Sequence, residues 1–454
     1  MGTAFLLIRR IQLMRKLRYL KKIALLGLLG LSSLSSQAEE SLGASDAWLL
    51  AVKNGKPMTG FRFRYEDVNQ DSSNNLKEAH AFTLRSLIGW QTAPWKNLSL
   101  TAQFIGVSDL NDDFNDKKWN VNAPGKSGYA VVQDPNFYDV NQLYLDWTAI
   151  PNTKLRLGQQ SLKLDNVRFI GNVEFRQVMQ VFSGLTIENQ TIPNTDLLVG
   201  YYVDYRKATT SQKLNDDTAI VHANYRLSPN ENLTAYGYWY DTNNSQFAVT
   251  GSANPSGMVD LSNQSVGLRA DGGRSINGLW KVLYTAEYAK QKAITGGDSH
   301  INAHYYKLGL GLAKGDWYLR ADQEMLSSNN GLYAFQTPLG TNHLFQGWVD
   351  KFAASTPVHG LKDSYLSAGG KWQAFTFMTE YHWFDADQDF STGGGMGKHY
   401  GKEWDASMAY AYNKQSTVKL EYGSFHEGDH YLGSSSVTRY RNTQKLWLTT
   451  NYNF

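Results

Sequence analysis

The alternation of side chains in the last ten residues, 445–454, constrains the fold of this chain more than any other feature. Successive side chains of a strand point to opposite faces. One face would carry Leu446, Leu448, Thr450, Tyr452 and Phe454, and the other Lys445, Trp447, Thr449, Asn451 and Asn453. An apolar face that ends in aromatic residues, opposite a face of amides and hydroxyls, is typical of a strand between lipid and water. A soluble edge strand can also end in an aromatic residue, so the rest of the chain has to decide.

The beginning of the chain predicts export. Seven basic residues precede the apolar run Ile23–Leu34, and the small residues Ser36 and Ala38 follow it. This order is typical of a secretory signal peptide, which we place at residues 1–38. An uncleaved membrane anchor is the alternative, but the apolar run is too short to span a bilayer. Met14 would give a start with a basic region of more usual length.

Charge and cysteine content narrow the class of protein. The chain has no cysteine, which fits an exported protein that uses neither disulfides nor thiolate-bound metal. Without the signal peptide, 37 basic residues (44 less seven) face 41 acidic ones, a balance of −4. The whole-chain charge of +3 is therefore no sign of nucleic-acid binding, and we expect none.

Hydropathy and aromatic content together point to a barrel. The mean hydropathy of −0.45 is that of a soluble protein, yet the chain contains 27 Tyr, 20 Phe and 13 Trp. Half-polar strands give such an average, and aromatic residues form the girdles of membrane barrels. After the signal peptide no apolar stretch is long enough for a membrane helix, so the chain can cross a membrane only as a closed sheet.

Amphipathic strands follow one another along the chain. In the first, Phe61, Phe63 and Tyr65 alternate with charged residues. We count about eighteen strands, an even number, as single-chain bacterial barrels require. They lie near residues 61–66, 82–90, 98–107, 138–149, 154–161, 180–189, 195–206, 217–228, 231–241, 262–271, 278–291, 302–313, 316–326, 362–370, 373–385, 402–413, 416–426 and 443–454.

The connections between these strands alternate in length. Short turns carry Pro, Gly or Asn, as at residues 150–152 and 228–230. Long polar loops lie between them, at residues 108–137, 242–261, 327–361 and 386–400. We therefore predict an all-β, antiparallel up-and-down transmembrane barrel with short periplasmic turns and long external loops. Residues 39–57 would form a short periplasmic segment, and residues 58–454 the barrel of a Gram-negative outer membrane.

Several segments carry a family resemblance. They are FRFRYEDVNQD from Phe61, FTLRSLIGWQTAPW from Phe82, DLNDDFND from Asp109, and the stretch NQLYLDWTAIPNTKLRLGQQSLKLDNVRFIGNVEFRQVMQVFSGLTIENQTIPNT from Asn141. With them the chain resembles the alginate-export-domain family of outer-membrane proteins. The resemblance implies a monomeric barrel whose loops fold inward over a basic lumen. The segment 175–184 departs from the family pattern, which has Trp-Arg-Gln-Asn followed by a Phe-Asp pair, so the substrate does not carry over.

Charged residues of the early strands and of loop 162–179 form the candidate site. This loop interleaves charged residues with Phe169, Ile170 and Phe175, so we expect it to fold into the lumen, with an external loop closed by local ion pairs as the alternative. The expected pore-lining or substrate-binding residues are Arg62, Arg64, Arg85, Arg156, Lys163, Asp165, Arg168, Glu174, Arg176 and Arg206. Acids of late strands also turn inward, namely Glu380, Glu403, Asp405 and Glu421, accompanied by Lys419 and Lys445. Opposed charges across a water-filled pore set its ion preference.

Metal and enzyme signals are weak. Residues 385–393 have the oxygen spacing of a calcium loop, but Phe390 stands where the turn needs Gly, and no bidentate Glu follows. A second acidic cluster lies within residues 109–116. We predict no metal and no cofactor. The sequence lacks a G-x-S-x-G motif, so we expect no enzyme, although a barrel-embedded hydrolase or a surface receptor remain alternatives.

These observations predict a passive outer-membrane channel for anionic or polar solutes, among them uronate polysaccharide or small organic anions. A general or nutrient-specific porin with no link to polysaccharide is the main alternative. The expected partners are outer-membrane lipid, lipopolysaccharide, the solute, and the barrel-assembly machinery. The last strand resembles the C-terminal signal which that machinery reads in bacterial outer-membrane barrels.

Overall fold

The structure is a computed structural model that describes residues 44–71, 76–116, 126, 128–208, 213–242, 260–294, 296–432 and 440–454. The predicted signal peptide lies outside these residues and stays a prediction. The chain divides into two units, residues 1–50 and 51–454. Helix α2 (Ala44–Lys53) lies within the segment 39–57 expected before the barrel. No helix in the described part of the chain is long and apolar enough to cross a bilayer.

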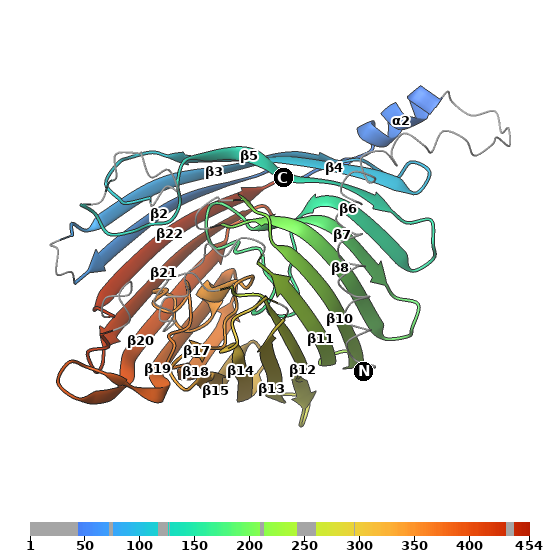
Figure 1. Cartoon of the computed structure of the whole chain (residues 1–454). Helices are drawn as coiled ribbons and strands as arrows, with labels where there is room; N and C mark the ends of the chain where they lie inside the picture. Colours follow the sequence, from blue (N-terminus) through green and yellow to red (C-terminus); the bar gives the residue numbers. More distant parts are fainter. Residues whose placement is uncertain are drawn as a thin grey trace, which may run out of the picture. The chain divides into compact units, whose positions relative to one another are not determined.

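The second unit is a closed antiparallel barrel, as predicted (Figure 1). Each long strand pairs with the next one along the chain, and β2 pairs with β22 from Gly60–Asn453 to Gln70–Thr443, which closes the ring. The eighteen strands are β2 (Gly60–Gln70), β3 (Ala79–Gln91), β4 (Leu98–Asp109), β5 (Phe137–Trp147), β6 (Thr153–Gln160), β7 (Val181–Asn189), β8 (Thr195–Arg206), β10 (Asp217–Ser228), β11 (Glu231–Asp241), β12 (Asn263–Ser275), β13 (Trp280–Ala293), β14 (Asn302–Lys314), β15 (Trp317–Leu326), β18 (Leu361–Trp372), β19 (Phe375–Ser391), β20 (Met396–Ala411), β21 (Ser416–Glu427) and β22 (Thr443–Asn453).

Minor elements complete the second unit. β1 (Lys56–Pro57) pairs with β3, and β9 (Lys213–Leu214) pairs with β8. Between β15 and β18 the chain forms the small hairpin β16 (Ser328–Asn329) and β17 (Tyr333–Ala334) and the short 3-10 helix η2 (Asn342–Leu344).

The last strand shows the two faces predicted for it. Leu448 and Tyr452 are exposed on the outside of the barrel, whereas Trp447, Thr449 and Lys445 are buried on the inside. Apolar residues outside and mostly polar ones inside are what a strand needs between lipid and an aqueous lumen.

Aromatic residues gather on the outer face near both ends of the strands. Close to the short turns, Trp317 stacks on Phe377 with ring centroids 6.4 Å apart. Close to the long connections, Tyr381 and Trp383 lie 4.6 Å apart by the same measure. Two such belts mark the two interfaces of a membrane.

The hairpin of β19 and β20 extends further than expected. The predicted external loop 386–400 is wrong in extent, because β19 runs to Ser391 and β20 begins at Met396. The Asp385 carboxylate is paired with Lys362 at 2.9 Å and with His399 at 2.5 Å. The acidic stretch that resembles a calcium loop is therefore mainly strand, and Asp385 already has cationic partners.

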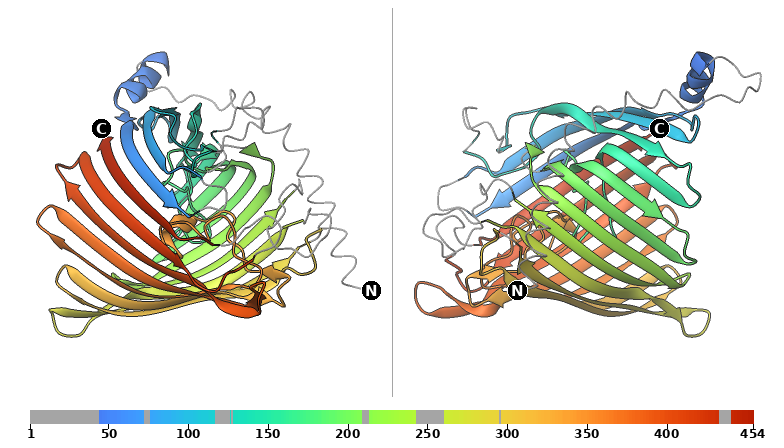
Figure 2. Two further views of the ribbon diagram at one scale, coloured as in Figure 1. Left: turned by 90° about the vertical axis from the view of Figure 1, so that its left-hand side faces the viewer. Right: turned by 45° about the vertical axis from the view of Figure 1, so that its right-hand side comes forward.

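Two connecting segments fill part of the lumen (Figure 2, left). Leu162 and Ile170 of loop 162–179 belong to one buried cluster with inward-facing tyrosines of the barrel. Val349 and Phe352 of segment 327–360 belong to another, on the side of β18 to β21. The inward position of segment 327–360 differs from the sequence-based prediction, which is an external loop at residues 327–361.

Candidate functional site

Three arginines of the first two barrel strands form a cluster on the inner face. We call Arg62, Arg64 and Arg85 the arginine cluster, in which Arg62 of β2 lies directly opposite Arg85 of β3. Arg62 Nη1 donates to the backbone oxygen of Glu174 at 2.6 Å, and Arg64 Nη1 donates to that of Phe175 at 2.6 Å. Loop 162–179 thus touches the cluster through its carbonyl groups.

Arg85 differs from the other two arginines. It is 6 % exposed, and its Nε and Nη1 atoms have no hydrogen-bond partner among the described residues. A guanidinium stays charged at any working pH, so its buried donors need an acceptor. The neighbouring charges of Arg62 and Arg64 make that need stronger.

The positive charge of the arginine cluster lowers the pKa of the neighbouring acid, Glu174. Burial raises the pKa of Glu174, but the hydrogen bond and charge of Lys163, together with the charges of Arg85 and Arg62, more than offset this and hold the pKa below its usual value. Glu174 is therefore ionised and paired with Lys163. The region where loop 162–179 meets β2 and β3 favours negative charge.

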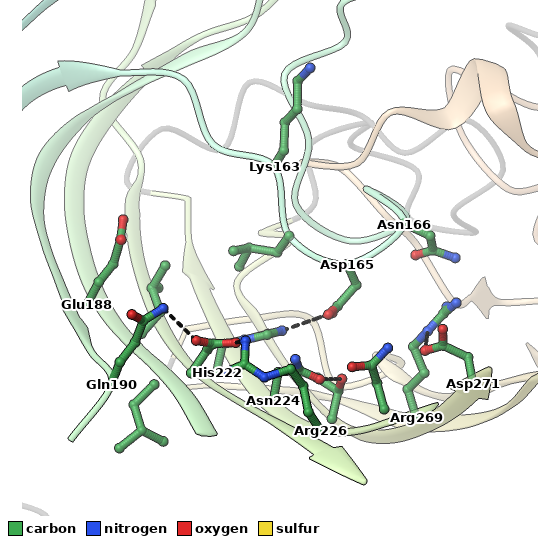
Figure 3. A pocket seen from close by; sticks show the side chains of 16 residues that line it. Lys163, Asp165, Asn166, Glu188, Gln190, His222, Asn224, Arg226, Arg269 and Asp271 are labelled. Atoms are coloured by element: carbon green, nitrogen blue, oxygen red, sulfur yellow. Dashed lines mark hydrogen bonds and ion pairs between the residues drawn. The ribbon is translucent and has the colours of Figure 1, made fainter. Parts of the chain in front are cut away.

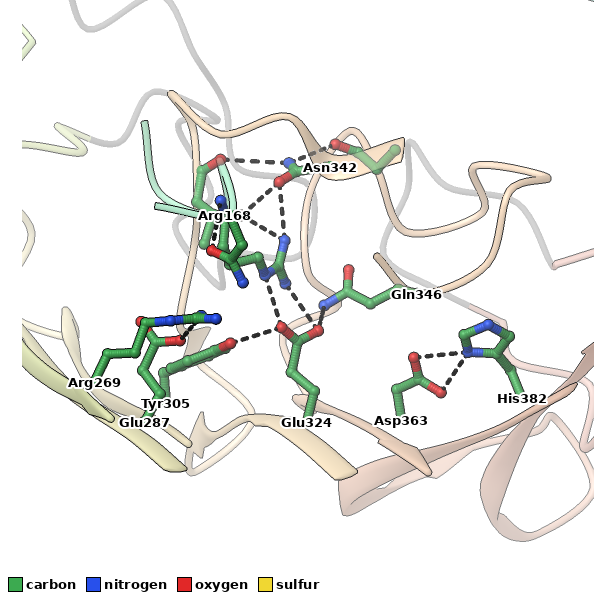
Figure 4. A network of polar contacts seen from close by, with 12 residues as sticks. Arg168, Arg269, Glu287, Tyr305, Glu324, Asn342, Gln346, Asp363 and His382 are labelled. Carbon is green, nitrogen blue, oxygen red and sulfur yellow. Dashed lines mark hydrogen bonds and ion pairs between the residues drawn. The ribbon is translucent and has the colours of Figure 1, made fainter. Parts of the chain in front are cut away.

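Arg168 ties loop 162–179 to β15 and segment 327–360 (Figure 4). Its fully buried guanidinium donates to both oxygens of Glu324, at 2.8 and 3.2 Å, and to Asn342 Oδ1 at 2.9 Å. The Tyr305 hydroxyl and the Gln346 amide also donate to Glu324, each at 2.9 Å. The donors of Arg168 thus point into the protein and not toward the open lumen.

Backbone contacts join the same two segments. Gly171 donates to the backbone oxygen of Leu339 at 2.9 Å, and Thr341 donates to that of Val167 at 2.9 Å. Val167 has φ +60°, a left-handed conformation that is rare for a β-branched residue. The surrounding contacts must hold the loop in this strained conformation.

Arg176 forms the second link. It donates to Glu66 of β2 at 3.0 Å and to Asp350 of segment 327–360 at 3.1 Å. Burial raises the pKa of Asp350, but the charges of His343, Lys445 and Arg176 outweigh this and lower it. Asp350 is therefore ionised, and Arg176 joins the early strands to segment 327–360.

The other expected site residues lie apart from the cluster. Arg156 pairs with Asp146 at 2.7 Å, and Arg206 donates to Asn141 Oδ1 at 2.7 Å. Asp165 accepts from His222 Nε2 at 3.0 Å. The structure therefore brings together Arg62, Arg64, Arg85, Lys163 and Glu174, and gives the remaining residues separate polar partners.

A cavity of about 630 Å³ opens beside the loop (Figure 3). Lys163, Asp165 and Asn166 of loop 162–179 line one side of it, and inward-facing polar residues of β7 to β12 line the other. Lys163 borders this cavity, but its side chain points away from the other lining residues (Figure 3), and it pairs with Glu174, the acid next to the arginine cluster. The barrel-wall residues of its lining are Glu188, Asp196, Leu197, Leu198, His222, Asn224, Arg226, Asn232, Thr234, Arg269 and Asp271, with Gln190 from the adjoining turn.

The inward-facing acids of the late strands bind segment 327–360, which sequence reasoning missed. Glu403 accepts the backbone N–H of Val349 at 2.6 Å, and Glu380 accepts from the Trp348 indole at 3.1 Å. The signal lay in the segment itself, because Trp348, Val349 and Phe352 are too apolar for a loop in water. Within the described residues, no group of three or more His, Asp or Glu side chains is placed to hold a metal ion.

The barrel is similar to several solved structures from Pseudomonas aeruginosa. OpdQ aligns with a TM-score of 0.64 at 13 % identity over 89 % of this chain and 99 % of its own. OccK9 (OpdG) gives 0.65 at 13 % identity over 89 % and 100 %, and OpdK with vanillate gives 0.64 at 11 % over 89 % and 99 %. At these identities the likeness shows the fold. A search among curated proteins returns no relative of the sequence.

A family model described as alginate export matches residues 101–444, about three quarters of the chain. This match agrees with the resemblance found in the sequence. It also agrees with the closed barrel and with the two belts of aromatic residues on its outer face. The chain belongs to the alginate export family of outer-membrane channel proteins.

Proposed function

We propose that this barrel is a passive channel for carboxylated solutes, and that the arginine cluster is their principal binding site. Arg85 carries the proposal, because its Nε and Nη1 donors are buried beside two further guanidinium groups and lack an acceptor within the described residues. A carboxylate fits such donors through two parallel hydrogen bonds. Uronates and small organic acids both present this group.

The surroundings support a path to the cluster. The cavity beside loop 162–179 is open, polar and bordered by Lys163, whose partner Glu174 lies next to Arg62 and Arg85. Several weak sites in sequence permit conduction, whereas one tight site would retain the solute. The rings of Phe175 and Tyr144 that cover Arg64 and Arg156 would also suit an aromatic acid such as the vanillate in the OpdK structure.

We assign Arg168 and Arg176 a positioning role within this channel. Both are buried and bound to acids, so their charge is largely compensated. They hold loop 162–179 and segment 327–360 in the lumen, where these segments limit the size of the passage.

Planar-bilayer recordings test the proposal. We expect Arg85→Gln to shift the reversal potential in a salt gradient toward cations and to weaken block by a uronate oligomer about tenfold or more, as expected for loss of about 1.4 kcal/mol of charge-assisted binding. Arg320→Gln is the control, since Arg320 also faces the lumen but is paired with Asp322 at 2.8 Å. It should change the reversal potential and leave uronate block intact. Equal block of the wild type and Arg85→Gln would refute the site.

A further inference from the structure

The rim with short turns has a step between β11 and β12. β11 begins at Glu231, which pairs with Gly272 of β12, whereas β12 continues to Ser275 beside β13. Residues 273–275 of β12 therefore extend beyond the start of β11. The Gly273 N–H donates to the backbone oxygen of Asn230 in the short turn at 2.9 Å, which fixes this step.

An ion pair occupies the step on the outer face of the barrel. Arg274 and Glu231 share their face with the exposed Leu233 and Leu268, whereas their neighbour Arg269 points inward. Arg274 Nη2 lies 3.0 Å from Glu231 Oε1, which also accepts from the Tyr284 hydroxyl at 2.9 Å. The arginine side chain is 77 % exposed and the glutamate only 9 %.

The position of this pair along the strands places its charge near one edge of the lipid-facing surface. Arg274 pairs with Val282, two residues from Trp280, which begins β13 in the belt of aromatic residues at this rim. Charged side chains on the lipid face are costly toward the middle of a bilayer and tolerated near its interface. Arg274 thus lies where lipid headgroups meet acyl chains, the depth at which arginine reaches phosphate.

A groove adjoins the ion pair. It has a volume of about 400 Å³ and is lined by Ile276 and Val282 together with the polar groups already named. Apolar surface beside an exposed guanidinium matches the two parts of a phospholipid, its phosphodiester and the upper part of its acyl chains. A soluble partner would have to displace lipid from the surrounding apolar face, so a phospholipid is the better fit.

We propose that Arg274 binds the phosphodiester of one phospholipid in the periplasmic leaflet, with Glu231 and Tyr284 orienting the guanidinium and with Ile276 and Val282 contacting the acyl chains. Exposed arginine donors suit phosphate oxygens, and the buried carboxylate prevents the side chain from turning away. This site lies on the outside of the barrel and does not depend on the solute that passes through it.

Native mass spectrometry of the purified barrel with added dioleoyl phosphatidylethanolamine or phosphatidylglycerol tests the proposal. We expect one retained lipid per wild-type barrel and about tenfold weaker retention for Arg274→Gln, equal to about 1.4 kcal/mol. Arg274→Lys should recover part of it. Lys281→Gln is the control, because Lys281 belongs to the same hairpin but its neighbours on that face of β13 point inward.

Heat-modifiable mobility on gels shows that each variant is folded before lipid is added. Equal retention by the wild type and Arg274→Gln would overturn the proposal. So would an equal loss with Lys281→Gln, which would mean that the lipid responds to net charge and not to this groove.

Discussion

Breaking the buried pair of Arg168 and Glu324 should release the two segments that fill the lumen. Both side chains are at most 2 % exposed. In Arg168→Met the donors left to the Glu324 carboxylate among the described residues are the neutral groups of Tyr305 and Gln346. Removal of one partner of a buried ion pair costs about 3–5 kcal/mol, because the other charge stays buried without compensation.

Hydrogen exchange measures this loss locally. The amides of Gly171 and Thr341, which join the two segments, should exchange roughly a hundredfold faster in Arg168→Met, the factor for the lower bound of that cost. Single-channel conductance should rise in parallel as the passage widens.

The double variant Arg168→Met/Glu324→Met is the decisive comparison. It removes both charges, so exchange should return close to the wild-type rate and show a coupling of about 3 kcal/mol between the residues. Effects of the single variants that add within about 0.5 kcal/mol would refute the reasoning. They would mean that packing, and not the ion pair, holds the segments.

Three further perturbations test the barrel and the segment packed inside it. Val221→Arg, on the outer face of β10, should destabilise the folded barrel by about 2–4 kcal/mol, measured by chemical unfolding from vesicles. Asn224→Arg, on the inner face beside the cavity, should destabilise it less. Equal losses of stability would mean that the two faces are assigned the wrong way round. Deletion of Phe454 should lower the yield of heat-modifiable barrel at low expression, because its N–H donates to Thr59 and its ring joins the aromatic belt; an unchanged yield would contradict this. While segment 327–360 is packed in the lumen, burial and the charge of Lys445 lower the pKa of Lys351 from 10.5 to about 7. Between pH 7 and 10.5 the lysine is therefore mostly neutral in the packed segment and protonated in the released one. Closure of segment 327–360 should therefore strengthen as the pH rises from about 7 toward 10.5, measured by hydrogen exchange corrected for intrinsic rates, and Lys351→Met should abolish this trend.

The membrane-spanning strands, whose side chains alternate between lipid and lumen, could be predicted from the sequence. Alternation in β22 and its neighbours follows from contact with acyl chains on one face, and it predicted both the strand number and the orientation of Trp447 and Leu448. Where strands extend beyond the bilayer, both faces meet water or protein and the alternation loses its meaning. For this reason the sequence pattern predicts a loop at Asp387, which the structure places in β19.

The site could be predicted only in part. Parity placed Arg62, Arg64 and Arg85 on the inner face, because their strands are regular. Nothing in the sequence reveals that Arg168 meets Glu324, which is 156 residues away, or that Arg85 Nε and Nη1 have no acceptor among the described residues. Such pairings depend on how irregular segments pack inside the barrel, and local patterns do not encode that.

The seam between β2 and β22 has a consequence for the order of folding. Within the described part of the chain, every other pairing between long barrel strands joins strands that follow one another in sequence, but the seam joins residue 60 to residue 453. In an unstructured chain, closing a loop of this length costs about 4 kcal/mol more entropy than closing a four-residue hairpin. The hairpins are therefore expected to form first and the seam last. Until then the sheet has two open edges, and any strand offered by another protein can pair with either of them.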